Sequence, residues 1–557
     1  MVILFKIMTH RYDWCCAIVS SLLQADLLLI NGKIVTVDQD ETIAQAVAVK
    51  GNRIIHVGSD SDMKTLTGGD SLVIDLEGKT VLPGFIDSHV HVLGAGRLQI
   101  MAREYVDIKY ADSISEVLEK IGERVKVTPK GEWIIGWGYL WSRFKEKRAP
   151  YGHELDMVAP ENPVLLNFSA MGVANSLALK QAGVTKDSKP DYGEVELDPD
   201  SGEPNGRLQG GAAVRLVSRH VPPLKAEPYE AASLACDQWT RWGITTAHQA
   251  GATRTDFTFL QKMKRDGDLQ LRFRLYIHNM TSNLEFMDHA IALGLQSGFG
   301  DDMLKISGVK LALDSMGSMG NAATYAPCTG NPGSLGILLV TPEKLEEMIV
   351  RAHKAGLQTA THSIGDRAID INLDAIETAI KEHPNTDHRH RIEHCTQCTP
   401  KQLARIKELG VHPGESNYIW NFGDAYKYQF GLERSEWLYP YKSFKEYGII
   451  ASANSDYGGG PWHGNPIIGI YSMVTRRTEG GDTVGPSQAV DVMDAIKAYT
   501  INGAHASFDE DNLGSIEEGK LADMIVLSDD ITSVNSEKIK EITVEKTILD
   551  GRIVYEK

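Results

Sequence analysis

The sequence predicts an α/β fold: a TIM-like (β/α)8 barrel with a long insertion and a small composite β-sandwich built from both ends of the chain. Apolar strand-like runs alternate with helical patterns through the middle of the chain, which is typical of a parallel sheet. Short β-branched runs broken by turn dipeptides stand at both ends. The length of 557 residues exceeds the roughly 250 of a bare barrel, so an insertion and a second domain are expected.

The two chain ends carry similar hairpin patterns. LINGKIVTVD at residues 29–38 and ILDGRIVYEK at residues 548–557 share a turn dipeptide, a basic residue and Ile-Val. Because chain ends commonly lie close together, we expect residues 25–82 and 507–557 to form one β-sandwich domain.

The barrel is expected over residues 83–506. Its clearest repeating unit begins with a helix at Thr341-Pro342, which ends near Ala355-Gly356 and is followed by the strand LQTATH. The pattern is less regular over about residues 97–228, which we interpret as a long insertion that carries substrate contacts.

Composition and charge narrow the classes of partner. The net charge of −17 repels phosphate backbones and anionic lipid heads, which argues against nucleic acid and membranes. Six cysteines are too few for a disulfide scaffold, which favours a reducing, cytoplasmic compartment. Residues 1–24 are expected to be an extension, with an export signal as the weaker alternative, because the apolar run CCAIVSSLL is too short to span a membrane. The expected partners are a small-molecule substrate and a second copy of the chain.

The sharpest chemical signal is VLPGFIDSHVH at residues 81–91, an apolar strand that ends in His89-Val-His91. Residues two apart on a strand point to one side, so both imidazoles can reach one cation. The alternative is a pair of polar residues at a strand end. Taken alone, the pattern leaves both interpretations open.

Three further candidate metal ligands each lie at the end of an apolar run, just before a loop. They are His362 in TATHSIGDRA, His394 in RIEHC and Asp456 in ANSDYGG. Strand ends of this kind lie on the catalytic face of a barrel. Any one of them alone is as well explained by a structural role. Their common position at strand ends indicates a shared metal site with His89 and His91.

Lys310 in GVKLALD is the fifth element of the predicted site. Strand alternation places Val309, Leu311 and Leu313 against the helices, so Lys310 faces the barrel interior. A buried ammonium beside a cation is unfavourable, so this side chain either pairs with Asp314 or becomes a carbamate that bridges two metals. The residues by themselves favour the ion pair.

These motifs, together with GITTAH and the terminal GSIEEGKLADMIVL, resemble the amidohydrolase superfamily, in the family 3 branch that includes N-substituted formamide deformylase. The resemblance extends from about Ala25 to the C-terminus. It implies metal ligands on five barrel strands: His89, His91, a carboxylated Lys310, His362, His394 and Asp456. In this branch a Gly-His-Met segment is usual where Ser169-Ala170-Met171 stands here, which puts the inherited substrate in doubt.

The resulting hypothesis is a metal-dependent hydrolase that cleaves the C–N bond of a small amide, N-substituted formamide or cyclic amide. One or two divalent ions are expected, with zinc preferred for an imidazole-rich site. Asp456 is the expected general base, and His394 or His362 would polarise the carbonyl if one metal is bound. The candidate substrate contacts are His248, Asn175 and Trp141. A catalytically silent sensor of the same fold and a lactone or phosphoester hydrolase are the alternatives.

Overall fold

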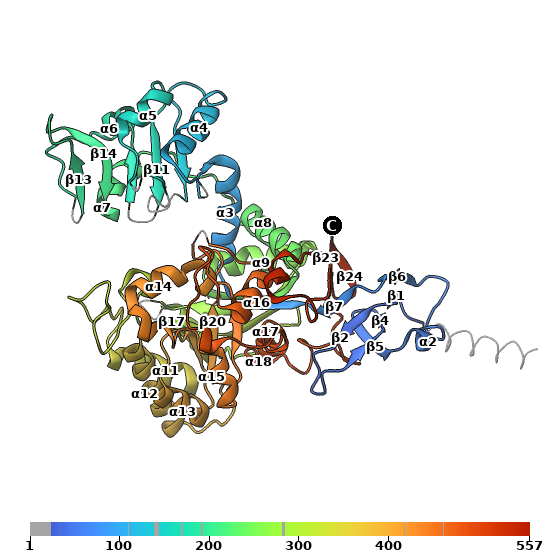
Figure 1. Cartoon of the computed structure of the whole chain (residues 1–557). Coiled ribbons are helices and arrows are strands. Elements are labelled where there is room, and N and C mark those ends of the chain that lie inside the picture. The colour runs from blue at the N-terminus through green and yellow to red at the C-terminus, as the bar shows by residue number, and fades with distance from the viewer. Residues whose placement is uncertain are drawn as a thin grey trace, which may run out of the picture. The chain divides into compact units, whose positions relative to one another are not determined.

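The computed structural model describes residues 24–109, 111–138, 144–146, 148–168, 171–190, 193–280, 285–416, 418–460 and 462–557. The predicted N-terminal extension lies outside these described residues, apart from Gln24. The chain divides into two compact units (Figure 1). One is Gly96–Glu227, and the other combines the residues up to Ala95 with Pro228–Lys557.

Eight parallel strands form the centre of the larger unit. In sheet order they are β8 (Phe85–Val90), β15 (Ile244–Ala252), β16 (Arg272–His278), β17 (Leu304–Ala312), β18 (Gln358–Ser363), β19 (Arg391–His394), β20 (His412–Ser416) and β21 (Ser452–Asn454). The last strand returns to the first, because the Ser88 hydroxyl donates to the Ala453 carbonyl at 2.9 Å and the Asp456 N–H donates to the His89 carbonyl at 2.9 Å. The predicted (β/α)8 barrel is thus confirmed as a nearly closed barrel.

Helices follow the barrel strands along the chain. They are α8 (Pro228–Arg241), α9 (Arg254–Asp266), α10 (Glu285–Ala292), α11 (Pro342–Lys354), α12 (Asp366–Glu382), α13 (Pro400–Leu409), α14 (Tyr418–Ser435), α15 (Tyr441–Glu446), α16 (Pro466–Thr475), α17 (Val492–Ala498) and α18 (Ile501–His505). Among the helices that the structure describes, none has the length and apolar character needed to cross a bilayer.

The packing of β17 against α11 shows how the sequence specifies this layer. Thr341 caps the helix by accepting the Lys344 N–H at 3.3 Å, with proline at the first helical position, as the sequence predicts. Val309, Leu311 and Leu313 share one buried apolar cluster with residues of α11 and α12. Each such side chain contributes about 1.5–3 kcal/mol on burial. The alternation that packs them against the helices turns Lys310 toward the barrel interior.

The residues near the two chain ends form two mixed sheets, of which the first contains N-terminal strands alone and the second contains strands from both ends. One contains β5 (Arg53–Gly58), β4 (Ala46–Lys50), β1 (Leu27–Ile30) and β6 (Leu72–Asp75). The other contains β24 (Arg552–Glu556), β23 (Val544–Leu549), β22 (Met524–Leu527), β7 (Thr80–Pro83), β2 (Lys33–Val35) and β3 (Ile43–Ala44), and the short helix α2 (Asp60–Met63) precedes β6. In Figure 1 the red C-terminal strands lie beside the blue N-terminal ones, since β22 pairs antiparallel with β7. The two sheets share one apolar core, which confirms the predicted composite β-sandwich.

The smaller unit, Gly96–Glu227, has a six-stranded sheet of its own. Its strands are β13 (Glu194–Leu197), β14 (Pro204–Gln209), β12 (Met171–Ala174), β11 (Val164–Phe168), β10 (Ile134–Trp137) and β9 (Val106–Asp107), and its helices are α4 (Ile114–Val125), α5 (Gly152–Val158), α6 (Ser176–Ala182) and α7 (Gly211–Ser218). The helix α3 (Val92–Glu104) leads into it from β8. Two buried apolar clusters lie within this unit, so the predicted insertion has cores of its own.

A buried ion pair joins the barrel to the C-terminal strands of the sandwich. Arg272, the first residue of β16, is fully buried. Its guanidinium contacts both carboxylate oxygens of Asp523 at 2.7 and 2.9 Å and donates to Asp550 at 2.8 Å. Asp523 lies directly before β22, and Asp550 lies in the turn between β23 and β24. The pair therefore fixes the sandwich strands on the barrel.

We expect Arg272→Met to destabilise the protein by about 3–5 kcal/mol, because Asp523 would remain buried without its partner. Chemical unfolding measures this loss. Lys381→Met is the matched control, since it removes an exposed ion pair with Glu377 on α12 and should change stability by no more than about 0.5 kcal/mol. Equal stability of the two variants would show that the pair does not hold the sandwich in place.

Candidate metal centre

Two histidines stand at the C-terminal end of β8. His89 is only 1% exposed, whereas His91, directly after the strand and before α3, keeps a partly exposed side chain. Their rings lie 5.5 Å apart between centroids. Strand alternation thus turns both imidazoles toward one point, as the His-x-His pattern predicts.

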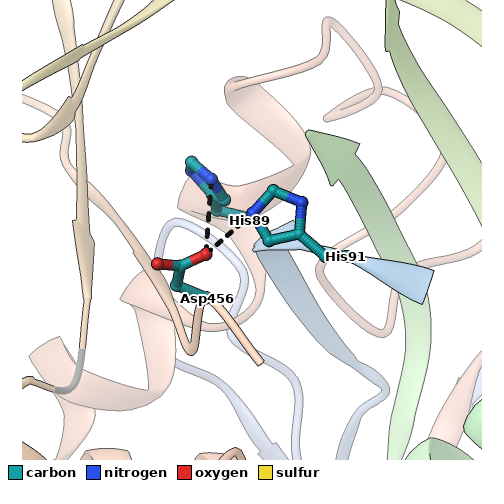
Figure 2. A group of neighbouring side chains, drawn as sticks. All are labelled: His89, His91 and Asp456. Atoms are coloured by element: carbon teal, nitrogen blue, oxygen red, sulfur yellow. Dashed lines mark ion pairs between the residues drawn. The ribbon is translucent and has the colours of Figure 1, made fainter. Parts of the chain in front are cut away.

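Asp456 completes a three-residue group with these histidines (Figure 2). Its Oδ1 lies 3.0 Å from Nε2 of His91 and 3.6 Å from Nε2 of His89. One ligand atom from each residue lies within 4.8 Å of the other two, a spacing that suits a single metal ion. Burial by itself raises the pKa of Asp456, but the hydrogen bond with His91 and the charge of His89 hold it well below its usual range. The carboxylate is therefore ionised at neutral pH.

Hydrogen bonds between the residues after β21 and strand β8 hold Asp456 in place. Its backbone adopts a left-handed conformation, with φ of 48°. Next to it, Ser455 donates its N–H and its hydroxyl to the carboxyl of Asp87 on β8, at 3.0 and 2.5 Å. Burial raises the pKa of Asp87 to about 7. A non-glycine residue in this conformation costs on the order of 1–3 kcal/mol, and such strain is characteristic of functional sites.

His394 and His362 border the same space from β19 and β18. The His394 ring lies 5.0 Å from His89 and 4.5 Å from His362, between centroids. Nε2 of His362 has no hydrogen-bond partner within the described part of the chain. Burial lowers the pKa of His362 to about 3 and that of His394 well below its usual range. Both rings are therefore neutral at physiological pH, which is the form that binds metals.

Lys310 enters the site from β17, but its expected ion pair with Asp314 is wrong. Its Nζ lies 3.1 Å from Nε2 of His89. Asp314 instead accepts backbone N–H groups of Ala323, Ile364 and Gly365 at 2.9–3.0 Å, which occupies both its oxygens. The strand ends at Ala312, so the alternation that relates Lys310 to Asp314 does not continue that far. Burial lowers the pKa of Lys310 to about 8, which favours its neutral amine more than usual.

Glu393 and Arg391 also belong to the site, although the sequence analysis did not select them. Glu393 contacts Nδ1 of His89, and Arg391 pairs with Glu393. Regular alternation would turn Glu393 away from the face that carries His394. The left-handed backbone of His394, with φ of 72°, breaks that alternation and lets both side chains face the interior. Asp87 is another site residue that was not predicted. Its spacing of two from His89 could have indicated it, because residues two apart on a strand share a face.

The predicted substrate contact His248 lies away from the mouth of the barrel. His248 is fully buried in the middle of β15, where its Nδ1 accepts a hydrogen bond from Arg391 at 3.0 Å, so it lies deeper than the predicted position at the mouth. Trp141 and Ala170 lie outside the described residues.

Asn175 has a structural position that contradicts the predicted substrate contact. It is the N-cap of α6, and its Oδ1 accepts the N–H groups of Val164 and Ala178 at 2.9 and 3.0 Å. Its amide nitrogen donates to the carbonyls of Ala159 and Asn162 at 3.1 and 2.9 Å. Because the buried side chain already uses all its donors and acceptor sites, it has none left for a substrate.

Comparison with known proteins assigns the family. Residues 72–555 match the model of the amidohydrolase family. The chain belongs to amidohydrolase family 3. This family member is 30% identical over 551 residues to N-substituted formamide deformylase of Arthrobacter pascens, which covers 96% of this chain and 98% of that one. It is therefore a metal-dependent hydrolase of the amidohydrolase superfamily.

Solved structures support the same fold. An uncharacterized metal-dependent hydrolase from Pyrococcus horikoshii OT3 has a TM-score of 0.70 at 26% identity, over 92% of this chain and 99% of that one. Atrazine chlorohydrolase TrzN from Arthrobacter aurescens TC1, solved in complex with zinc, has a TM-score of 0.53 at 15% identity over 95% of both chains.

The position of Asn175 leads to a test. Asn175→Ala should lower the stability of the protein by about 2 kcal/mol, because it removes a helix cap and leaves buried backbone groups unpaired. Calorimetry measures the stability, and steady-state kinetics on the folded fraction measures KM. A raised KM with unchanged stability would instead restore the role in substrate binding.

Proposed function

We propose that this family member hydrolyses the C–N bond of a small amide, N-substituted formamide or cyclic amide, by means of a divalent metal. The observation that carries the proposal is the His89, His91 and Asp456 group, whose ligand atoms converge at the C-terminal end of the barrel strands. The end-to-end similarity to a protein named N-substituted formamide deformylase supports the choice of bond.

Zinc is the proposed metal, with one or two ions per chain. The donor set consists of imidazole nitrogens and a carboxylate, which suits zinc better than magnesium. The Nε2 atom of His362 is buried and makes no hydrogen bond within the described residues, which also fits a site that receives a cation. A second ion would use His362 and His394, with a carboxylated Lys310 between the two ions. When bound, such a cation lowers the pKa of a water molecule to about 7 and polarises a carbonyl group.

Within this proposal, Asp456 is the general base. Its ionised carboxylate accepts the proton of the attacking water and passes it to the leaving nitrogen. The hydrogen bonds from Ser455 to Asp87 keep the Asp456 carboxylate directed toward the two histidines. With one ion bound, the neutral ring of His394 would stabilise the carbonyl oxygen as its charge develops.

Metal removal is the first test. Purified protein should contain one or two equivalents of zinc by elemental analysis, and dialysis against a chelator should abolish turnover of an amide panel until zinc is returned. Full activity in protein shown to be free of metal would refute the proposal.

Asp456→Asn tests the proton transfer. Asn keeps the shape and one oxygen but accepts no proton near neutral pH, so kcat should fall at least ~10²-fold while KM and zinc content stay near those of the parent. Asp509→Asn is a control, because Asp509 is also buried but pairs with Arg274 and Lys305.

The alternatives give different results in the same assay. A parent protein that binds zinc but turns over no amide, formamide or cyclic amide would favour the silent sensor. Turnover confined to lactones or phosphoesters would move the activity to another bond. An Asn variant as active as the parent would show that Asp456 is not the base.

A further inference from the structure

We propose that Glu393, held by Arg391, is a positioning residue that fixes the ring of His89 as a metal ligand. The inference rests on the proposed function only in that His89 binds a metal. It is carried by an unbroken series of buried contacts from Arg391 through Glu393 to His89.

The contact between Glu393 and His89 sets the tautomer of the imidazole. The Glu393 carboxylate contacts Nδ1 of His89, and both side chains are 1% exposed. An ionised carboxylate only accepts hydrogen bonds, so Nδ1 carries the proton. Nε2 is left with its lone pair, and this is the nitrogen that faces Asp456. A ring in this tautomer and orientation is ready to bind a cation.

Arg391 keeps Glu393 ionised and in place. Its Nε lies 2.7 Å from one carboxylate oxygen of Glu393, and its Nη2 donates to the other at 3.0 Å. The hydrogen bond from Nη2 and the close approach of Nε hold the carboxylate against the guanidinium. Burial alone would raise the pKa of Glu393, but the positive charge of Arg391 holds it well below its usual range.

The Arg391 guanidinium also binds the backbone of β8, the strand that carries His89. Nη2 of Arg391 donates to the carbonyl of Ser88 at 2.7 Å. Nη1 contacts the hydroxyl of Tyr276 and Nδ1 of His248, each at 3.0 Å. His89 is therefore held at two points, by its ring through Glu393 and by its backbone through Ser88.

A structural role alone explains this arrangement poorly. Burying an ion pair costs solvation energy that its attraction often fails to recover, so apolar side chains of similar size would serve stability as well. Glu393 is also poorly placed to be a ligand itself, since its Oε2 already contacts both His89 and Arg391, and its Oε1 lies 2.7 Å from Nε of Arg391. What the pair adds is a fixed direction for the His89 ring.

Glu393→Gln tests the inference in the full-length protein. If Gln turns its oxygen toward His89, its amide NH2 faces Nε of Arg391, so two donors meet and the negative charge that pairs with Arg391 is lost. Competition with a chromogenic chelator should show zinc affinity reduced by on the order of 10- to 100-fold. The visible spectrum of the Co²⁺-loaded variant should also change, because it reports ligand geometry. Excess zinc should restore much of the lost turnover.

Two further variants keep the test decisive. Asp509→Asn weakens another buried ion pair of the barrel and should leave zinc affinity and the Co²⁺ spectrum unchanged, whatever its effect on stability. Glu393→Asp keeps the charge for Arg391 but shortens the reach to His89, so it should fold if the Gln variant does not, and should also weaken zinc binding.

The outcomes separate the two proposals. A parent that binds no metal would refute the proposed function, and this inference with it. A parent that binds zinc, together with Glu393 variants that bind it equally tightly and give the parental Co²⁺ spectrum, would overturn the positioning role alone.

Discussion

The closure of the barrel between β8 and β21 is the constraint on which the site depends. His89 and Asp456 are far apart in the sequence, and they meet only because the last strand returns to the first. Two sets of hydrogen bonds join these strands. The Asp456 N–H donates to the His89 carbonyl, and Ser455 donates to the carboxyl of Asp87. At the same point Asp456 adopts a left-handed backbone, and its carboxylate faces the histidines. Closure of the barrel therefore also brings His89 and Asp456 together.

The interior of the barrel beneath the site is polar, unlike its outer layer. Val309, Leu311 and Leu313 make an ordinary apolar contact with the helices, whereas Lys310, Arg391 and Glu393 place charges inside. Buried charges persist only where each has a partner or shifts its pKa. Arg391 and Glu393 are partners of one another, whereas the pKa of Lys310 is lowered to about 8. The solvation free energy lost on burying these charges is offset by the packing of the rest of the fold. The result is a set of side chains that are already oriented around the proposed metal centre.

The sequence predicts the barrel, the composite sandwich and the gathering of side chains at strand ends, because these depend on periodicity and on the direction of parallel strands. His89, His91 and Asp456 meet as expected, with His362 and His394 beside them. What failed depends on local backbone geometry. Lys310 lacks its expected partner because the strand ends before Asp314, and Glu393 was missed because His394 leaves the extended conformation. Asn175 was misinterpreted because a helix cap and a polar substrate contact use the same residue types.

The most direct test of the proposed metal centre is a crystal structure with anomalous scattering recorded on both sides of the zinc absorption edge. We expect a zinc peak about 2.0–2.2 Å from Nε2 of His89, Nε2 of His91 and a carboxylate oxygen of Asp456. A crystal grown with zinc that shows no peak between these three residues, or a zinc peak only at other side chains, would contradict the assignment of this site as the centre of hydrolysis.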